Sequence, residues 1–119
     1  MTKLLGVSDF GFQWSTDEQV WPFEKTRNGE TIYCKEVDFG IGPNGTNKTV
    51  AHNIPNFEAT DDLFRVEILT VNDIPGNEAY MLPDIGVVVT SYITPTVCYV
   101  GTSGNLSGYT LTFRLWYKK

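Results

Sequence analysis

Hydrophobic and polar residues alternate along much of this chain, which is the pattern of β-strands that bury one face. The clearest case lies at the end, where every second residue from Tyr109 to Tyr117 is large and apolar. The positions between them carry mostly polar side chains, such as Thr110, Thr112 and Arg114. We therefore expect the last strand to turn one face to a hydrophobic core and the other to solvent.

Strand-like segments recur along the chain, and helical periodicity is hard to find. In one of them, Phe64, Val66 and Ile68 alternate with Arg65 and Glu67, so the apolar three should face the core. Clusters of Gly, Pro, Asn, Asp and Ser separate the segments, as in an antiparallel sandwich or barrel. The segments predicted as strands are 31–39, 46–52, 63–71, 86–93, 96–100 and 109–117.

The segment Val87 to Val89 is apolar at three consecutive positions and shows no alternation. Such a run is typical of a central strand that is covered on both faces. A partner subunit can supply one of these covers.

The first 28 residues show no period but are rich in aromatic side chains. Ser15 and Glu18 have the spacing of a capping box, which allows one helical turn. A free tail would leave the apolar surface of these rings in water. We therefore expect an arm that packs on its own sandwich or on a neighbouring subunit. The alternative is a solvent-facing platform for carbohydrate. The aromatic residues are Phe10, Phe12, Trp14, Trp21 and Phe23.

These patterns predict an all-β fold: a single antiparallel β-sandwich, jelly-roll-like, with an irregular N-terminal arm. The arm comprises residues 1–28 and the sandwich residues 29–119. The candidate docking or ligand-contact residues are Trp14, Trp21, Phe23 and Trp116.

Composition supports one globular domain and excludes several classes of partner. The chain has 119 residues, of which 41% are hydrophobic, and a net charge of −5. Its few basic residues are scattered, which argues against nucleic acid, and no apolar run is long enough to span a membrane. The N-terminus lacks the apolar core of a signal peptide, so we expect synthesis in a cytoplasm.

The two cysteines, Cys34 and Cys98, lie far apart without a CxxC spacing. In a cytoplasm we expect two buried free thiols, with a disulfide as the alternative. One histidine and two cysteines offer no clustered ligands, so no metal or other cofactor is expected. The single histidine, His52, is expected to be a hydrogen-bonded structural residue at a strand end.

The stretch from Gly42 to Thr49 resembles a phosphate-binding P-loop but carries Asn47 in place of the second glycine. The β-branched Thr49 and Val50, followed by Pro55, prevent the helix that such a loop requires. We interpret this stretch as a tight hairpin connection between strands, in which Gly40, Gly42 and Gly45 supply positive φ angles.

No arrangement of residues indicates catalysis. The carboxylate pairs Asp17-Glu18 and Asp61-Asp62 are neighbours in sequence, whereas a glycosidase needs two carboxyl groups converging across a cleft. Asp61 and Asp62 are expected to cap or charge the loop before the strand at Leu63. A nucleophile-elbow motif is absent from the sequence. We therefore expect a protein that is not an enzyme.

Several strings in the N-terminal half resemble a module found at or near the C-termini of tail-fibre, appendage and receptor-binding-like proteins of tailed phages and prophages. Looser agreement continues through the turn at 102–104, the 107–109 string and the final 115–119 string. The strings that carry the resemblance are Ser15 to Val20, Asn28 to Lys35, Val37 to Gly40, Pro43-Asn44 and Lys48 to Ile54.

This resemblance implies a non-enzymatic virion structural protein, a tail-fibre, appendage or head-fibre component that docks on the particle as a homotrimer. Its partners would be other virion proteins, and its location the virion, after synthesis in the host bacterial cytoplasm. The alternative that it implies is a receptor-binding fibre tip that holds a cell-surface saccharide or protein.

Overall fold

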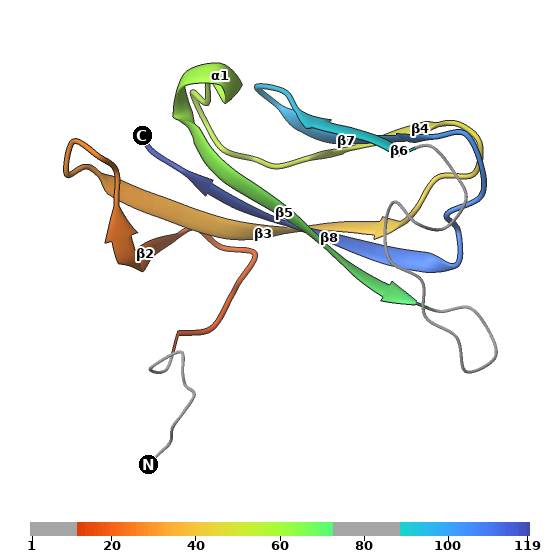
Figure 1. Cartoon of the computed structure of the whole chain (residues 1–119), viewed down its shortest axis with the longest axis horizontal. Helices are drawn as coiled ribbons and strands as arrows, with labels where there is room; N and C mark the ends of the chain where they lie inside the picture. Colours follow the sequence, from red (N-terminus) through yellow and green to blue (C-terminus); the bar gives the residue numbers. More distant parts are fainter. Residues whose placement is uncertain (1–11, 73–88) are drawn as a thin grey trace, which may run out of the picture.

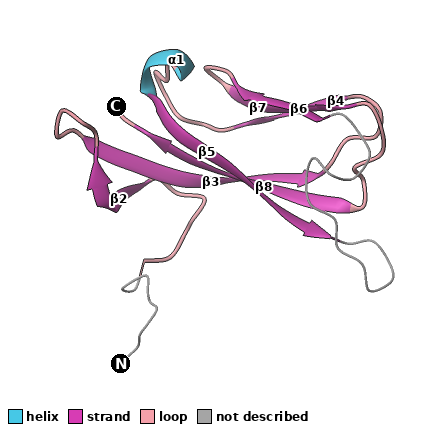
Figure 2. Ribbon diagram, in the orientation of Figure 1, coloured by secondary structure: helices cyan, strands magenta, loops and turns pink. Residues whose placement is uncertain are grey.

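The structure is a computed structural model, and it describes residues 12–72 and 89–119. Within these ranges the regular secondary structure is almost entirely strand, and α1 is a single helical turn (Figure 2). The elements are β2 (Gln19–Lys25), β3 (Thr31–Ile41), β4 (Asn47–Ala51), α1 (Ala59–Asp62), β5 (Leu63–Asn72), β6 (Val89–Ile93), β7 (Val97–Thr102) and β8 (Tyr109–Tyr117).

The strands form two layers, as Figure 1 shows. One sheet has four strands in the order β2-β3-β8-β5, and the other has three in the order β4-β7-β6. Every pairing is antiparallel. The antiparallel β-sandwich predicted from the sequence is therefore confirmed, and the six predicted strand segments match β3 to β8 within a few residues.

The core between the sheets is built on β8. All five alternating residues of β8 are buried, as the sequence predicted. They pack against β3 on one side, against β7 from the opposite sheet, and against the segments that link the strands. The remaining buried members of this core are Val37, Phe39, Ile54, Phe57, Cys98, Val100 and Leu106.

The predicted core face of β5 is only partly correct. Ile68 packs against the core, but Phe64 and Val66 are 42% and 43% exposed. The register of β5 against β8 shifts between Leu63 and Arg65, which takes Phe64 out of the alternation. The strands β5 and β6 are edges of their sheets, and a trough of about 320 Å³ lies between them, lined by Val66 and Ile68 on the β5 side.

The N-terminal segment is more regular than the sequence suggested. Residues Gln19–Lys25, expected to be part of an irregular arm, form β2 and pair with β3. Pro22 obscures the strand signal because it lacks an N–H, but it is tolerated since β2 is an edge strand with a shifted register. The helical turn that the spacing of Ser15 and Glu18 allows does not form, and Ser15 Oγ instead accepts a hydrogen bond from Asp17 N.

The chain between β3 and β4 is a crossing between the two sheets rather than the predicted hairpin. Gly40 and Gly45 have the expected positive φ angles, of 81° and 63°. Gly42 serves close packing instead, because a Cβ there would lie 2.6 Å from the carbonyl oxygen of Leu106. Lys48, the lysine of the P-loop-like string, donates to the carbonyl oxygen of Ile41 at 2.8 Å.

Asp61 and Asp62 were expected to cap or charge the loop before β5, and they lie in α1, the turn that precedes this strand. Asp61 and Asp62 form the end of this one-turn helix, and Asp62 Oδ2 accepts a hydrogen bond from Glu58 N at 2.9 Å. Both carboxylates therefore belong to a turn that leads into β5.

The central position expected for the valine run can be examined only at Val89. Val87 and Val88 lie outside the described residues. Val89 begins β6, which is an edge strand of the three-stranded sheet. A strand at an edge does not require cover on both faces, so this run gives no support to a trimer.

His52 is a hydrogen-bonded structural residue, as predicted. It is buried, its Nδ1 accepts from Ile54 N at 3.1 Å, and its Nε2 lies 2.9 Å from the carbonyl oxygen of Thr94. Since Nδ1 accepts, the proton must be on Nε2, which donates to Thr94. Burial lowers the pKa of His52 below 6.5 and the charge of Lys35 adds to this, while the bond to Thr94 opposes it.

We expect the stability of the fold to fall as pH drops below about 6.5, because the unfolded chain then takes up a proton that the folded imidazole does not accept. One such group gives a slope of at most about 1.4 kcal/mol per pH unit. His52→Asn keeps an acceptor for Ile54 N but does not titrate, so its free energy of unfolding should be flat between about pH 7 and 5. Urea unfolding of the wild type and of His52→Asn at several pH values in this range measures the two slopes. Equal slopes in the two proteins would contradict the assignment to His52.

Candidate functional site

The outer face of the four-stranded sheet carries a second, smaller hydrophobic cluster. Trp116 lies on the face of β8 opposite to the core and pairs with Cys34 of β3. Together with Ile32 these residues are almost fully buried, Trp116 being only 3% exposed. Such burial on an outer face requires a covering segment, and residues of the N-terminal segment provide it.

Phe12, Trp14 and Trp21 pack on the buried group that contains Trp116, and Phe23 extends them through contacts with Phe12 and Trp21. We call Phe12, Trp14, Trp21, Phe23 and Trp116 the aromatic cluster. Trp14 and Trp21 meet the Trp116 ring edge to face at centroid distances of 5.1 and 5.6 Å. Phe12 makes similar contacts with Trp14 and Trp21 at 5.6 and 5.3 Å. Aromatic pairs favour this geometry, which places the positive edge of one ring on the negative face of another.

Two arginines flank the aromatic cluster. Arg114 lies 4.6 Å from the ring centroid of Trp14, and Arg65 lies 4.9 Å from that of Trp116. Arg114 Nε forms an ion pair with Glu36 Oε2 at 2.9 Å, and Arg65 Nη2 forms one with Glu24 Oε1 at 2.6 Å. Because the Arg65 pair is about 40% exposed, it orients the guanidinium more than it stabilises the fold.

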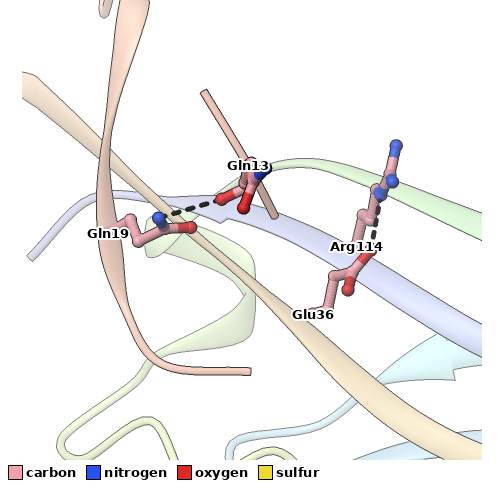
Figure 3. Close-up of polar contacts among 4 residues, drawn as sticks. All are labelled: Gln13, Gln19, Glu36 and Arg114. Atoms are coloured by element: carbon pink, nitrogen blue, oxygen red, sulfur yellow. Dashed lines mark hydrogen bonds and ion pairs between the residues drawn. The ribbon is translucent and has the colours of Figure 1, made fainter. Parts of the chain in front are cut away.

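Hydrogen bonds tie the covering segment to the sheet. Glu36 N donates to the carbonyl oxygen of Ser15 at 2.8 Å. Gln19 Nε2 donates to the carbonyl oxygen of Gln13 at 3.0 Å, a contact drawn in Figure 3 with the Arg114–Glu36 pair. The segment from Phe12 to Lys25 is therefore part of its own sandwich, which is one of the two placements expected from the sequence.

Glu18 makes a further link between this segment and the C-terminus. Its carboxylate accepts from the Tyr117 hydroxyl at 2.6 Å and from Lys119 Nζ at 2.8 Å. Burial raises the pKa of Glu18, but these two hydrogen bonds and the charge of Lys119 outweigh it, so the pKa lies below its usual value. Burial, with the adjacent Glu18, raises the pKa of Tyr117.

The four candidate residues of the sequence analysis come together in this cluster, but with unequal exposure. Trp116 is buried and forms the floor, so its assignment as a contact residue is corrected. Trp14 and Trp21 are half-buried, and Phe23 is 46% exposed. The sequence analysis missed Arg65 and Arg114 because their positions over the rings depend on strands far apart in the chain.

The indole N–H groups of Trp21 and Trp116 are buried without a hydrogen-bond partner. The cluster is thus held by ring packing and by the flanking arginines rather than by directed hydrogen bonds of its own.

The described residues hold neither a cluster of metal ligands nor a reactive thiol. Across residues 12–72 and 89–119, no group of three or more His, Cys, Asp or Glu side chains is placed to hold a metal ion. Cys34 and Cys98 are free, as predicted, and belong to the outer and inner clusters respectively. Burial raises the pKa of Cys34 to about 11 and of Cys98 to about 12, so neither is a thiolate nucleophile at neutral pH.

In these same two ranges there is no helix with the length and apolar character needed to cross a bilayer. Comparison with protein-family models, with curated proteins and with solved structures found no match to this chain. Function is therefore inferred from the surfaces of the molecule together with the sequence resemblance.

The burial of both thiols predicts their reactivity. In the native protein at about pH 8, a maleimide probe should label neither Cys34 nor Cys98, because both are fully buried and protonated. After denaturation without reductant, both should react, and mass spectrometry counts the added groups. A pair that reacts only after reduction would contradict the free-thiol assignment.

Trp116 should matter to stability far more than its exposed neighbour. We expect Trp116→Ala to lower the free energy of unfolding by about 3–5 kcal/mol, since it removes the floor of the cluster. Phe23→Ala, the matched control, should cost about 1 kcal/mol or less because the ring is half-exposed. Urea denaturation followed by far-UV circular dichroism compares them, and equal losses would refute this placement of Trp116.

Proposed function

We propose that this chain is a non-enzymatic structural protein of a tailed-phage virion surface, which docks on the particle through the rim of the aromatic cluster. The phage part of the proposal rests on the sequence resemblance. The docking part rests on one observation: apolar and aromatic side chains stay partly exposed on β2, around a floor that is already rigid. Phe23 is 46% exposed, and Trp21 is half-buried beside it. Val20, 54% exposed, pairs with Tyr33 and lies on the other face of β2, but it lines the same depression along this edge strand.

The chemistry of this rim suits a protein partner. A shallow depression of about 200 Å³ runs along β2, lined by residues 20–25 and Thr31. Aromatic and arginine side chains over a dry floor are typical of the residues that dominate protein interfaces. Each ring that loses its remaining water on docking would contribute up to about 1.5–3 kcal/mol.

The rim suits a carbohydrate platform less well. Such a platform offers a flat ring face to the sugar, whereas Trp14 and Trp21 are packed edge to face with their neighbours. The guanidinium of Arg114 also lies over the ring of Trp14. The receptor-binding alternative therefore finds little support on this surface.

The docking proposal is tested with point variants, because deleting residues 1–28 would also remove β2 from its sheet. Val20→Glu and Phe23→Glu place a charge on the rim, and burying either charge at an interface costs several kcal/mol. The matched control is Val71→Glu, at a 60% exposed apolar position on β5.

Each purified variant is added to particles that lack this protein, and incorporation is measured by quantitative immunoblotting. We expect both rim variants to lose incorporation while Val71→Glu is incorporated normally. Normal incorporation of both rim variants would sink the docking surface. A chain that is absent from wild-type particles would sink the virion assignment as a whole.

The homotrimer stays a prediction that rests on the resemblance alone. Light scattering coupled to size exclusion should give three times the chain mass of 13.4 kDa at micromolar concentration. A single species of 13.4 kDa would count against it.

A further inference from the structure

The outer edge of β5 is the least protected strand edge in the described part of the sandwich. Of the other edge strands, β4 and β6 have five residues each, and β2 carries Pro22 and a shifted register. β5 has ten residues and contains neither proline nor lysine. Among residues 12–72 and 89–119, no strand pairs with its outer edge. Such an edge presents backbone N–H and C=O groups to which another strand can bind.

Both faces of β5 are open at this edge. Arg65, Val66 and Glu67 are consecutive and all exposed. Successive side chains of a strand point to opposite faces, so Val66 faces inward while Arg65 and Glu67 face outward. On the inner side, Val66 lines the trough of about 320 Å³ together with Ile68 and with Ile93 of β6. A strand added along β5 would cover the open side of this trough and remove its apolar surface from water.

Charged side chains mark the outer face along the same edge. Arg114 of β8 pairs in register with Glu36 of β3 on one side and with Glu67 of β5 on the other. One row across the sheet therefore reads Glu36, Arg114, Glu67, with alternating charge, and it ends at the edge with a carboxylate. The neighbouring row pairs Trp116 with Arg65, so it ends with a guanidinium. The edge thus presents one negative and one positive side chain, two residues apart.

This charge pattern is complementary to itself. If two copies of β5 pair antiparallel about a twofold axis at Val66, Arg65 faces the partner's Glu67 and Glu67 faces the partner's Arg65. The alternation of charge then continues from one copy to the other, and Val66 faces the partner's Val66 over the trough. The smallest shift of register that keeps the inner and outer faces is two residues. That shift would set Arg65 against the partner's Arg65, or Glu67 against the partner's Glu67.

We infer that β5 is a self-pairing edge, through which two copies of this chain form one continuous sheet about a twofold axis at Val66. The pairing spans residues 63–69, so it leaves Val71 free, and β2 lies at the opposite edge of the sheet. The contact therefore requires neither the docking surface nor the phage assignment. It is short, so we expect a Kd on the order of 0.1 mM, and the trimer expected at micromolar concentration would be a separate contact.

Val66→Cys tests the axis, because only a residue on a twofold axis faces its own copy. Directly opposite residues have Cβ atoms about 4.5–5.5 Å apart, which a disulfide can bridge after a small adjustment. The native Cys34 and Cys98 are buried, so they do not compete. The matched control is Val71→Cys, on the same strand outside the pairing, where the native side chain is 60% exposed.

Both cysteine variants are incubated with oxidised glutathione at a protein concentration near the expected Kd, and non-reducing gel electrophoresis measures the linked pairs. Val66→Cys should link at least about tenfold faster than Val71→Cys, because the contact holds its two thiols at a high effective concentration. A trimer formed through another surface does not change this comparison. Equal rates, or no linkage at residue 66, would overturn the inference.

A charge reversal tests the register. Glu67→Arg sets like charges against each other at two symmetric positions and should weaken self-association by about tenfold or more. Asp38→Arg, the same charge change at an exposed position of β3, should associate as the wild type does. Sedimentation equilibrium measures both, after circular dichroism has shown that the fold is retained. Unchanged association of Glu67→Arg would refute the pairing of Arg65 with Glu67.

Mixing two variants supplies the converse test. Arg65→Glu carries two carboxylates at the edge and Glu67→Arg carries two guanidinium groups, so each should associate with the other better than with itself. Glu67→Arg should also be incorporated into particles normally, and Phe23→Glu should still pair through β5. Failure of the self-pairing edge and failure of the docking surface are therefore distinguished.

Discussion

The structure depends on β8 being buried on its inner face along its whole length and on its outer face at Trp116. Its alternating apolar residues fill the core between the sheets, and the opposite face buries Trp116. A central strand can be dry on both sides only if something covers its outer face. That requirement brings the segment from Phe12 to Lys25 back onto the sheet, where its rings surround Trp116. The aromatic cluster is thus a structural consequence of one tryptophan in the last strand, and its exposed rim follows from it.

The two sheets differ in size, and this leaves different surfaces on each. The four-stranded sheet uses its outer face for the aromatic cluster, while the three-stranded sheet leaves its outer face uncovered by any described segment. Among the described residues, the side chains around Gly101 on the outer face of the smaller sheet carry hydroxyl, amide and phenol groups.

The candidate residues show that local sequence pattern can identify side chains that need a packing partner, but not which of them stay exposed. Trp14, Trp21 and Phe23 stand out because aromatic residues in an aperiodic segment need a place to pack, and the structure gives them one. Trp116 stood out for the same chemistry, yet it is the floor of the cluster rather than a contact residue. Its exposure depended on whether a distant segment would cover it, which no property of β8 reveals. Asn47 drew attention for a resemblance to a P-loop, whereas its amide in fact positions a tyrosine ring 52 residues away.

The sequence by itself determined the strands from β3 to β8, the inward face of β8, the structural role of His52 and the free state of both thiols. These depend on local alternation or on single side chains, and are therefore readable from one stretch of chain. Only the tertiary structure decided that β2 is a strand, that β5 and β6 are edges, and that the link between β3 and β4 changes sheets. It also decided the pairing of Cys34 with Trp116 and the row Asn47, Gly101, Thr90. Strand order is set by how all the apolar faces can be buried together, and that is a property of the whole chain rather than of any segment.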